Sequence, residues 1–133
     1  MSAVPRWITR AAVLLLHEES IATFGGARGI RDEGLLDSAL ARPRNAYGYR
    51  PDISIAELAA SYAFGLAKIH ASVDGNKRAA FLSIGVFLAI NGFALNAEQP
   101  DAIRTMLTVA SGELGEHELA SWIQSNLVST ESN

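Results

Sequence analysis

Apolar side chains recur at helical spacing along most of the chain, and glycine or proline separates these segments. A first helix is expected from about residue 9 to about residue 24, where two glycines follow. A second, short helix is expected to begin after Asp32, a suitable N-cap, and to end at Pro43, because proline disfavours helical backbone in the residue before it. Residues 45–52 are expected to form an irregular connector, and a short hairpin near Tyr47 remains open.

The middle of the chain predicts two longer helices. Ser54 and Glu57 have the spacing of a capping box, and the helix behind them is expected to end near His70. The segment from about 76 to 90 is apolar nearly all round, which predicts the central buried helix of the fold. Asn91-Gly92 closes it.

Two further helices complete the pattern. Pro100 opens one of them, and Gly112 ends it. The last helix is marked by the apolar residues Leu119, Trp122, Ile123 and Leu127. No convincing run of alternating apolar and polar residues is present, which disfavours a Rossmann or P-loop sheet. The sequence therefore predicts an all-α bundle of five or six helices.

Composition narrows the class of protein. A length of 133 residues suits one domain, taken as residues 1–128, and the polar tail at 129–133 is expected to fray. The absence of cysteine excludes disulfides, thiolate metal sites and a cysteine nucleophile. A net charge of -3 and a pI near 5.5 argue against charge-driven binding of nucleic acid. The apolar run at 11–16 is too short for a membrane span and no signal-peptide cleavage pattern is present, so we expect a cytoplasmic protein without membrane contact.

One short segment, residues 70–78, combines groups suited to phosphate chemistry. His70 has an imidazole, whose usual pKa range suits a general base for a hydroxyl nucleophile. Asp74 offers a hard oxygen ligand for a magnesium ion that also contacts phosphates. Taken singly, each has an ordinary explanation, His70 as a helix C-terminal residue and Asp74 as an N-cap.

The four residues that follow open the next helix and favour an anion site. Gly75 allows the backbone to approach an anion closely, and Asn76 can cap the helix and orient a phosphate oxygen. Lys77 and Arg78 add cations, and Arg78 can bind phosphate in a bidentate fork. Cations in a first helical turn oppose the helix dipole by about 0.3–1 kcal/mol each, so their presence favours a bound anion over a solvated surface.

Other residues with possible chemistry have plainer interpretations. His17 and His117 lie in acidic stretches and are expected at the surface, without a metal. Tyr47 and Tyr49 either pack on the core or line a substrate groove, and the sequence does not separate these two roles.

At the 70–78 segment the chain resembles the Fic/Doc family, whose signature is approximately H-x-F-x-[D/E]-G-N-[G/K]-R. The lysine at position 77 resembles the Doc (death-on-curing) form of this signature, whereas Fic adenylyltransferases carry glycine at that position. The stretch 29–40 and Asn91-Gly92 also match Doc-like sequences, so the resemblance spans nearly the whole chain. It implies a compact bundle of about six helices.

The resemblance also implies an activity with ATP and Mg²⁺. Fic enzymes move AMP to a hydroxyl side chain, whereas Doc toxins move the γ-phosphate of ATP to a threonine of elongation factor Tu and halt translation. On this chain the resemblance makes His70 the catalytic base and Asp74 the metal ligand. The phosphate binders it implies are Gly75, Asn76, Lys77 and Arg78.

Two features favour the Doc branch. Many Fic enzymes carry a second arginine three residues after the first, and Phe81 occupies that place here. Many also contain a self-inhibitory [S/T]-x-x-x-E-[G/N] helix, and this sequence has none. Restraint would then come from another chain, and the resemblance implies a Phd-like antitoxin whose disordered C-terminal segment folds into a groove of the toxin.

Ser72 departs from the family pattern, which usually has phenylalanine there. Large-to-small core changes cost about 3–5 kcal/mol, and a loosened loop lowers catalysis that depends on positioning. Two alternatives to the kinase-type toxin stay open. One is a Fic-type AMP transferase, and the other is a catalytically attenuated helical module that acts by binding its antitoxin.

Overall fold

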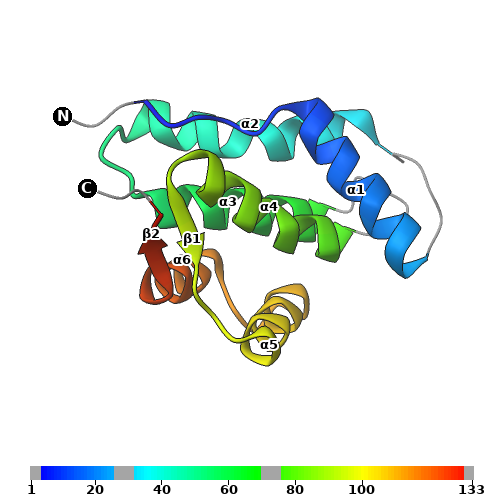
Figure 1. The fold of residues 1–133 in the computed structure, drawn as a ribbon. Helices are drawn as coiled ribbons and strands as arrows, with labels where there is room; N and C mark the ends of the chain where they lie inside the picture. Colours follow the sequence, from blue (N-terminus) through cyan, green and yellow to red (C-terminus); the bar gives the residue numbers. More distant parts are fainter. Residues whose placement is uncertain (1–3, 26–31, 70–75, 131–133) are drawn as a thin grey trace.

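The computed structural model describes residues 4–25, 32–69 and 76–130. Its elements are α1 (Arg10–Phe24), α2 (Glu33–Tyr49), α3 (Ile55–Ile69), α4 (Asn76–Ile90), β1 (Phe93–Leu95), α5 (Gln99–Ala110), α6 (Glu116–Ser125) and β2 (Leu127–Ser129). Figure 1 shows the helices packed side by side with one small sheet, which confirms the predicted all-α bundle. Within the described residues, no helix combines the length and the hydropathy needed to cross a bilayer.

Helix boundaries agree with the local signals in the sequence. Thr9 caps α1, because its hydroxyl accepts a hydrogen bond from the Ala12 backbone N–H at 3.1 Å. Asp32 caps α2 in the same way, accepting from the Leu35 N–H at 3.0 Å. Gly112 follows the end of α5 with φ at 87°, a conformation that favours glycine. These boundaries confirm the predicted starts of α1 and α2 and the end of α5.

The predicted end of the second helix at Pro43 is wrong. α2 continues through Pro43 to Tyr49, so helix replaces the possible hairpin near Tyr47 and most of the expected connector 45–52, of which residues 50–52 remain non-helical. Pro43 cannot donate the usual backbone hydrogen bond, but its side chain is fully buried. Arg42 just before it donates to the Ser61 carbonyl at 3.1 Å and to Glu116 at 2.7 Å, and Tyr47 packs on Trp7 beyond it. Tertiary contacts on both sides therefore outweigh the local cost of the proline.

A two-stranded antiparallel sheet was not predicted. Strands β1 and β2 pair Phe93 with Ser129, and β2 begins at Leu127, which had been assigned to the last helix. Ser129 and Thr130 are thus paired rather than frayed, since the Thr130 N–H also donates to a backbone carbonyl at 3.0 Å. The rest of the expected tail, 131–133, lies outside the described residues. Three-residue strands are too short to show an alternating pattern.

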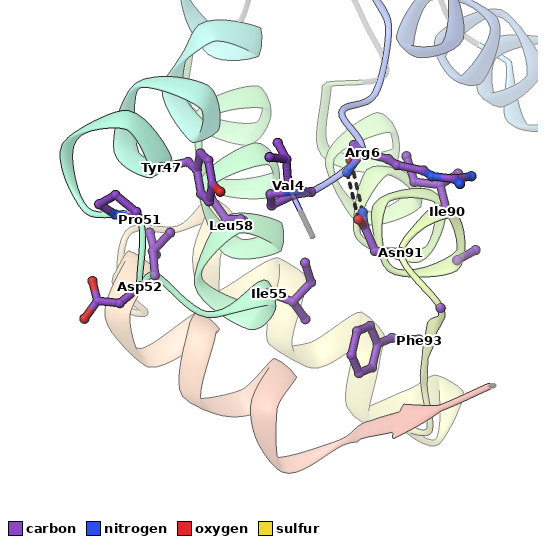
Figure 2. A pocket seen from close by; sticks show the side chains of 14 residues that line it. Val4, Arg6, Tyr47, Pro51, Asp52, Ile55, Leu58, Ile90, Asn91 and Phe93 are labelled. Atoms are coloured by element: carbon purple, nitrogen blue, oxygen red, sulfur yellow. Dashed lines mark hydrogen bonds between the residues drawn. The ribbon is translucent and has the colours of Figure 1, made fainter. Parts of the chain in front are cut away.

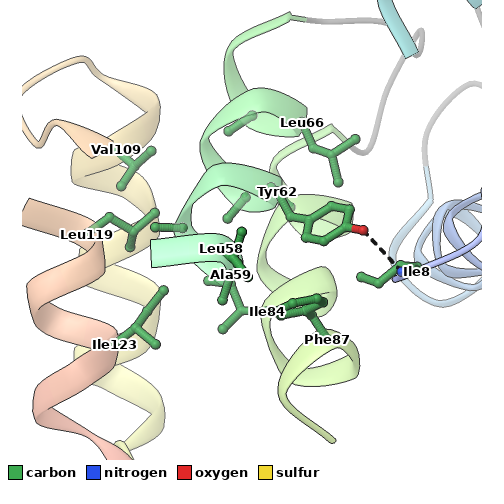
Figure 3. Packing of buried hydrophobic residues seen from close by; sticks show 14 of the residues in the cluster. Ile8, Leu58, Ala59, Tyr62, Leu66, Ile84, Phe87, Val109, Leu119 and Ile123 are labelled. Atoms are coloured by element: carbon green, nitrogen blue, oxygen red, sulfur yellow. Dashed lines mark hydrogen bonds between the residues drawn. The ribbon is translucent and has the colours of Figure 1, made fainter. Parts of the chain in front are cut away.

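Helices α3 and α4 share the centre of the molecule. α3 packs against α2, α4, α5 and α6, whereas α4 packs against α1, α3, α5 and β1. Figure 3 shows side chains of both helices facing each other, with the Tyr62 ring 5.1 Å from that of Phe87. The helix expected to be central, 76–90, does lie in the core, and α3 is buried more completely. Fully buried large side chains include Tyr62, Phe87, Leu36, Leu58, Ile84, Leu88, Leu119, Ile123 and Val109.

The segment before α1 ties these two central helices together. The Ile8 N–H donates to the hydroxyl of Tyr62 on α3 at 3.1 Å (Figure 3). The Asn91 side-chain amide accepts from the Arg6 N–H at 2.8 Å and donates to the Arg6 carbonyl at 3.0 Å. Burial raises the pKa of Tyr62, although the hydrogen bond from Ile8 acts in the opposite direction. The segment therefore fixes the relative position of α3 and α4, which flank the 70–75 segment.

Candidate functional site

The predicted motif lies where α3 leads into α4. Described backbone ends at Ile69 and resumes at Asn76, the first residue of α4. His70, Asp74 and Gly75 lie outside the described residues, as does Ser72. The side chains of Asn76 and Lys77 also lie outside them, so Arg78 is the motif side chain that the structure describes. What can be tested is therefore the start of α4 and its surroundings.

The N-terminus of α4 differs from most other helix starts in this protein. α2, α3, α5 and α6 each carry at least one acidic residue in the first turn, whereas α4 carries none. Lys77 and Arg78 occupy that turn instead. The first four N–H groups of any α-helix have no partner within the helix, and they carry partial positive charge. The start of α4 therefore has the charge expected of an anion-binding site.

Arg78 lies against the end of α1. Its guanidinium Nη1 lies 3.4 Å from the carbonyl oxygen of Gly25, and its side chain is exposed. Gly25 is the C-cap of α1 and has φ at 85°, which favours glycine. The C-terminal end of one helix thus holds the guanidinium beside the N-terminal end of another.

A second cation flanks the motif and was not identified from the sequence. Lys68 lies in the last turn of α3, two positions before His70, and is exposed. Its ammonium lies 5.9 Å from the centre of the Phe64 ring, a cation–π contact. A Cβ placed on Gly112 would lie 3.4 Å from the same nitrogen, so the end of α5 lies close to it. A lysine two positions before the motif histidine was the available signal.

Phe81 lies on α4, one turn after Arg78. The ring is half-buried and packs against the hydrophobic core. The place at which many Fic enzymes carry a second arginine is therefore part of the core packing in this protein.

The two tyrosines left open by the sequence have different surroundings. Tyr47 packs edge-on against Trp7, with ring centres 5.7 Å apart, and it also lines a hollow of about 690 Å³ (Figure 2). Ile90 and Asn91, at the C-terminal end of α4, line the same hollow. A helix of this length spans about 22 Å, so the hollow lies far from the start of α4. Tyr49 is 94% exposed. Tyr47 thus contributes to the core, at the opposite end of α4 from its first turn.

The prediction for the two remaining histidines is half right. His117 is exposed, as expected. His17 is buried, with 3% of its surface accessible, so its expected surface position is wrong. It lies on α1 one turn after the buried Val13, and the helical period overrides the polar neighbours Glu18 and Glu19. Among the described residues, no group of three or more histidine or carboxylate side chains is arranged to hold a metal ion.

Comparison with known proteins agrees with the motif. The family model described as Fic/DOC family matches residues 7–88, well over half of the chain, with all of α1 to α3 and most of α4. A protein of Mycolicibacterium smegmatis named Toxin Doc is 46% identical over 85 residues, covering 63% of this chain and 65% of that protein. Protein kinase doc of Escherichia phage P1 is 28% identical over 115 residues, covering 86% of this chain and 90% of that protein. The chain thus spans just under two thirds of the first relative.

Proposed function

Because the chain belongs to the Fic/DOC family, within its Doc branch, we propose that it is a toxin that moves the γ-phosphate of ATP to a threonine hydroxyl. The proposed acceptor is elongation factor Tu, so the effect is inhibition of translation. One observation carries the proposal: α4 begins within the signature segment, with cations and no carboxylate in its first turn. The relative named Protein kinase doc supports a kinase-type transfer over other uses of this scaffold.

The described start of α4 supports the binding of a nucleotide's phosphates. Arg78 is exposed at the start of α4, and a guanidinium can bind phosphate oxygens in a bidentate fork. Asn76, Lys77 and Gly75 are proposed to bind phosphate with it, and Asp74 to hold the metal. When bound, ATP supplies the phosphoryl group and Mg²⁺ supplies positive charge beside it.

The proposed mechanism relies on positioning and charge. His70 would accept the proton of the threonine hydroxyl, whose oxygen then bonds to phosphorus as ADP leaves. Arg78 and the first backbone N–H groups of α4 would stabilise negative charge on the phosphate oxygens. The hydrogen bonds from Arg6 to Asn91, directly after α4, and from Ile8 to Tyr62 on α3 would help to keep the two helices flanking His70 in a fixed relation.

A direct test uses purified protein, Mg²⁺ and purified elongation factor Tu. With ATP labelled at the γ-phosphate, label should appear on a threonine of the factor, and His70→Ala should abolish the transfer. ATP labelled at the α-phosphate should give no labelled protein. Label from the α-position would instead show the AMP transfer of Fic enzymes and would refute the kinase proposal.

Ser72 motivates the alternative of an attenuated binding module. Ser72→Phe restores the residue usual in the family and should raise the rate of transfer if a loose loop limits it. If wild type and Ser72→Phe are both inactive on elongation factor Tu, the kinase proposal fails. The binding module then becomes the better account.

A toxin of this branch needs restraint, and we propose an antitoxin of the Phd type as partner. The absence of a self-inhibitory motif from the sequence supports a restraint supplied by another chain. Co-expression of the neighbouring small reading frame should restore growth of cells that express this protein. Growth arrest that persists when that frame is co-expressed at equal or higher level would contradict it.

A further inference from the structure

The hollow of about 690 Å³ at the C-terminal end of α4 exposes large apolar side chains (Figure 2). Val4 is 66% exposed and Ile90 is 36% exposed, and both line the hollow. Ile55 and Phe93 are half-buried and line it from below in the view of Figure 2. Apolar side chains gathered at one hollow favour a binding surface over single exposed residues scattered on the protein.

Two side chains of opposite charge line the same hollow. Arg6 lies beside Asn91, to which its backbone is hydrogen-bonded, and Asp52 lies across the hollow next to Pro51 (Figure 2). Both side chains are exposed. Among the described residues that line the hollow, these two are the charged ones. Neither forms an ion pair with another residue in the part of the chain that the structure describes.

Other charged side chains close to this hollow already have contacts within the chain. Arg50, which precedes Pro51, pairs with Glu57. Arg44 lies over the ring of Trp7, 5.9 Å from its centre. A molecule that enters the hollow would therefore meet one cation and one carboxylate, on opposite sides.

From this arrangement we infer that the hollow is the contact surface of a homodimer with two-fold symmetry. In a two-fold contact, each residue faces a second residue of the other chain, and the same pair recurs on the opposite side of the axis. An axis that passes between Arg6 and Asp52 would place the guanidinium of each chain beside the carboxylate of the other. The apolar side chains of Val4 and Ile90 lie between the two charges and would be covered in the same contact.

Charge favours a second copy over other occupants. A strongly acidic or strongly basic partner would meet a like charge at one side of the hollow, which is unfavourable. Nucleic acid or an anionic lipid surface would be attracted by Arg6 but repelled by Asp52. A second copy supplies both complementary charges from one surface. The hollow lies at the other end of α4 from Arg78, so the inference does not depend on the proposed phosphoryl transfer.

Sedimentation equilibrium of the full chain at a series of concentrations tests the dimer. The wild type should show a monomer–dimer equilibrium. Arg6→Asp gives the contact two carboxylates from each chain, and Asp52→Arg gives it two guanidinium groups from each chain. Each variant should therefore dimerise at least about tenfold more weakly than the wild type.

Mixing the two reversal variants tests the symmetry of the contact. An equimolar mixture of Arg6→Asp and Asp52→Arg chains should form a heterodimer, because opposite charges then face each other on both sides of the axis. A fluorophore on one of the two variants lets sedimentation velocity detect the mixed species. One chain that carries both substitutions should recover the homodimer for the same reason.

An apolar variant tests the surface between the charges. Val4→Ser with Ile90→Ser should weaken dimerisation at least about tenfold. Leu15→Ser is the matched control, at a residue of α1 that is also 66% exposed, and should leave dimerisation unchanged. Circular dichroism confirms that each variant is folded before it is compared.

Several results would overturn the inference. A wild-type chain that stays monomeric at every concentration measured would do so. Dimerisation that is unchanged by the charge reversals or by the Val4/Ile90 variant would show that a different surface holds the dimer. Reversal variants that do not associate when mixed would refute the two-fold pairing of Arg6 with Asp52.

Discussion

The N-termini of α3 and α4 both present unpaired backbone N–H groups with partial positive charge, but the side chains of their first turns carry opposite charges. At α3 the Glu57 N–H donates to the Ser54 hydroxyl at 3.1 Å, and the Ser54 N–H donates to the Glu57 carboxylate at 3.2 Å. Arg50 adds an ion pair to that carboxylate. At α4 the first turn has no carboxylate and contains Lys77 and Arg78. One helix start is neutralised by a carboxylate of its own first turn, whereas the first turn of the other holds two cations and no carboxylate.

This difference separates scaffold from candidate site. α3 is the most completely buried helix, and a capped start adds to its stability. α4 shares the core along its length, but cations in its first turn oppose its own dipole. A bound ligand with negative charge would offset this repulsion between the cations and the helix dipole. Substitutions in α3 should therefore lower the free energy of unfolding. Substitutions at the start of α4 should instead change how the protein responds to a ligand.

The largest loss of stability is expected in the buried part of α3. Leu58→Ala removes a fully buried side chain and should lower the free energy of unfolding by about 2–5 kcal/mol. Urea denaturation followed by circular dichroism measures it. Leu15→Ala, at an exposed residue of α1, serves as the control and should change stability by less than about 0.5 kcal/mol. Equal losses in both variants would show that α3 is not the scaffold.

Removal of the α3 cap should have a smaller effect. Ser54→Ala deletes the hydroxyl that accepts from the Glu57 N–H and should cost about 1 kcal/mol. The same denaturation experiment applies, with Ser38→Ala in the exposed face of α2 as the matched serine control. A cap that contributes nothing would leave the two serine variants equally stable.

The charge of Glu57 should make stability depend on pH at the acidic end. Burial alone would raise the pKa of Glu57, but hydrogen bonds from Arg50 and Ser54 outweigh it and hold the pKa below its ordinary value of 4.5. A lowered pKa stabilises the folded protein above about pH 4.5, and this contribution is lost as the pH falls through the folded-state value.

Glu57→Gln tests this dependence. It should cost about 0.5 kcal/mol at neutral pH, because the ion pair is partly exposed. The loss should shrink at acidic pH, where the wild-type carboxylate is protonated. Urea midpoints measured from pH 7 to pH 3 follow the difference. A gap that stays constant over this range would contradict the lowered pKa.

The smallest effect on stability is expected at the start of α4. Arg78→Ala should change the free energy of unfolding by less than about 0.5 kcal/mol, since the side chain is exposed. Addition of ATP with Mg²⁺ should raise the melting temperature of the wild type and raise it far less in this variant. An equal rise in both would show that Arg78 does not bind the nucleotide.

Most helices of this protein were predictable because their signals are local. The Ser54–Glu57 capping box, the Asp32 cap and the Gly112 stop act within one helical turn, and each is found where the sequence placed it. The extension of α2 past Pro43 was not predictable, because Arg42 reaches partners on α3 and α6 that are distant in sequence. The pairing of β1 with β2 has the same origin, since it joins residues more than thirty positions apart.

The candidate site was predictable to a different extent. Its residue types and spacing pointed to the start of α4, and that helix does begin at Asn76. The sequence did not indicate that the end of α1 supplies a carbonyl to Arg78, or that Lys68 lies close to the end of α5. The roles of His70, Asp74 and Gly75 remain predictions, since these residues lie outside the described part of the chain.

The sequence by itself determined most helix starts and the glycine stops of α1 and α5, and it placed cations in the first turn of α4. Capping and dipole effects involve neighbours along the chain, which is why these features were predictable. Only the tertiary structure decided that α2 runs through its proline, that His17 is buried and that Ile103 and Leu107 of α5 stay exposed. Each of these depends on which surfaces meet after the helices pack. Burial of large side chains in the core contributes more free energy than a local preference in a single turn.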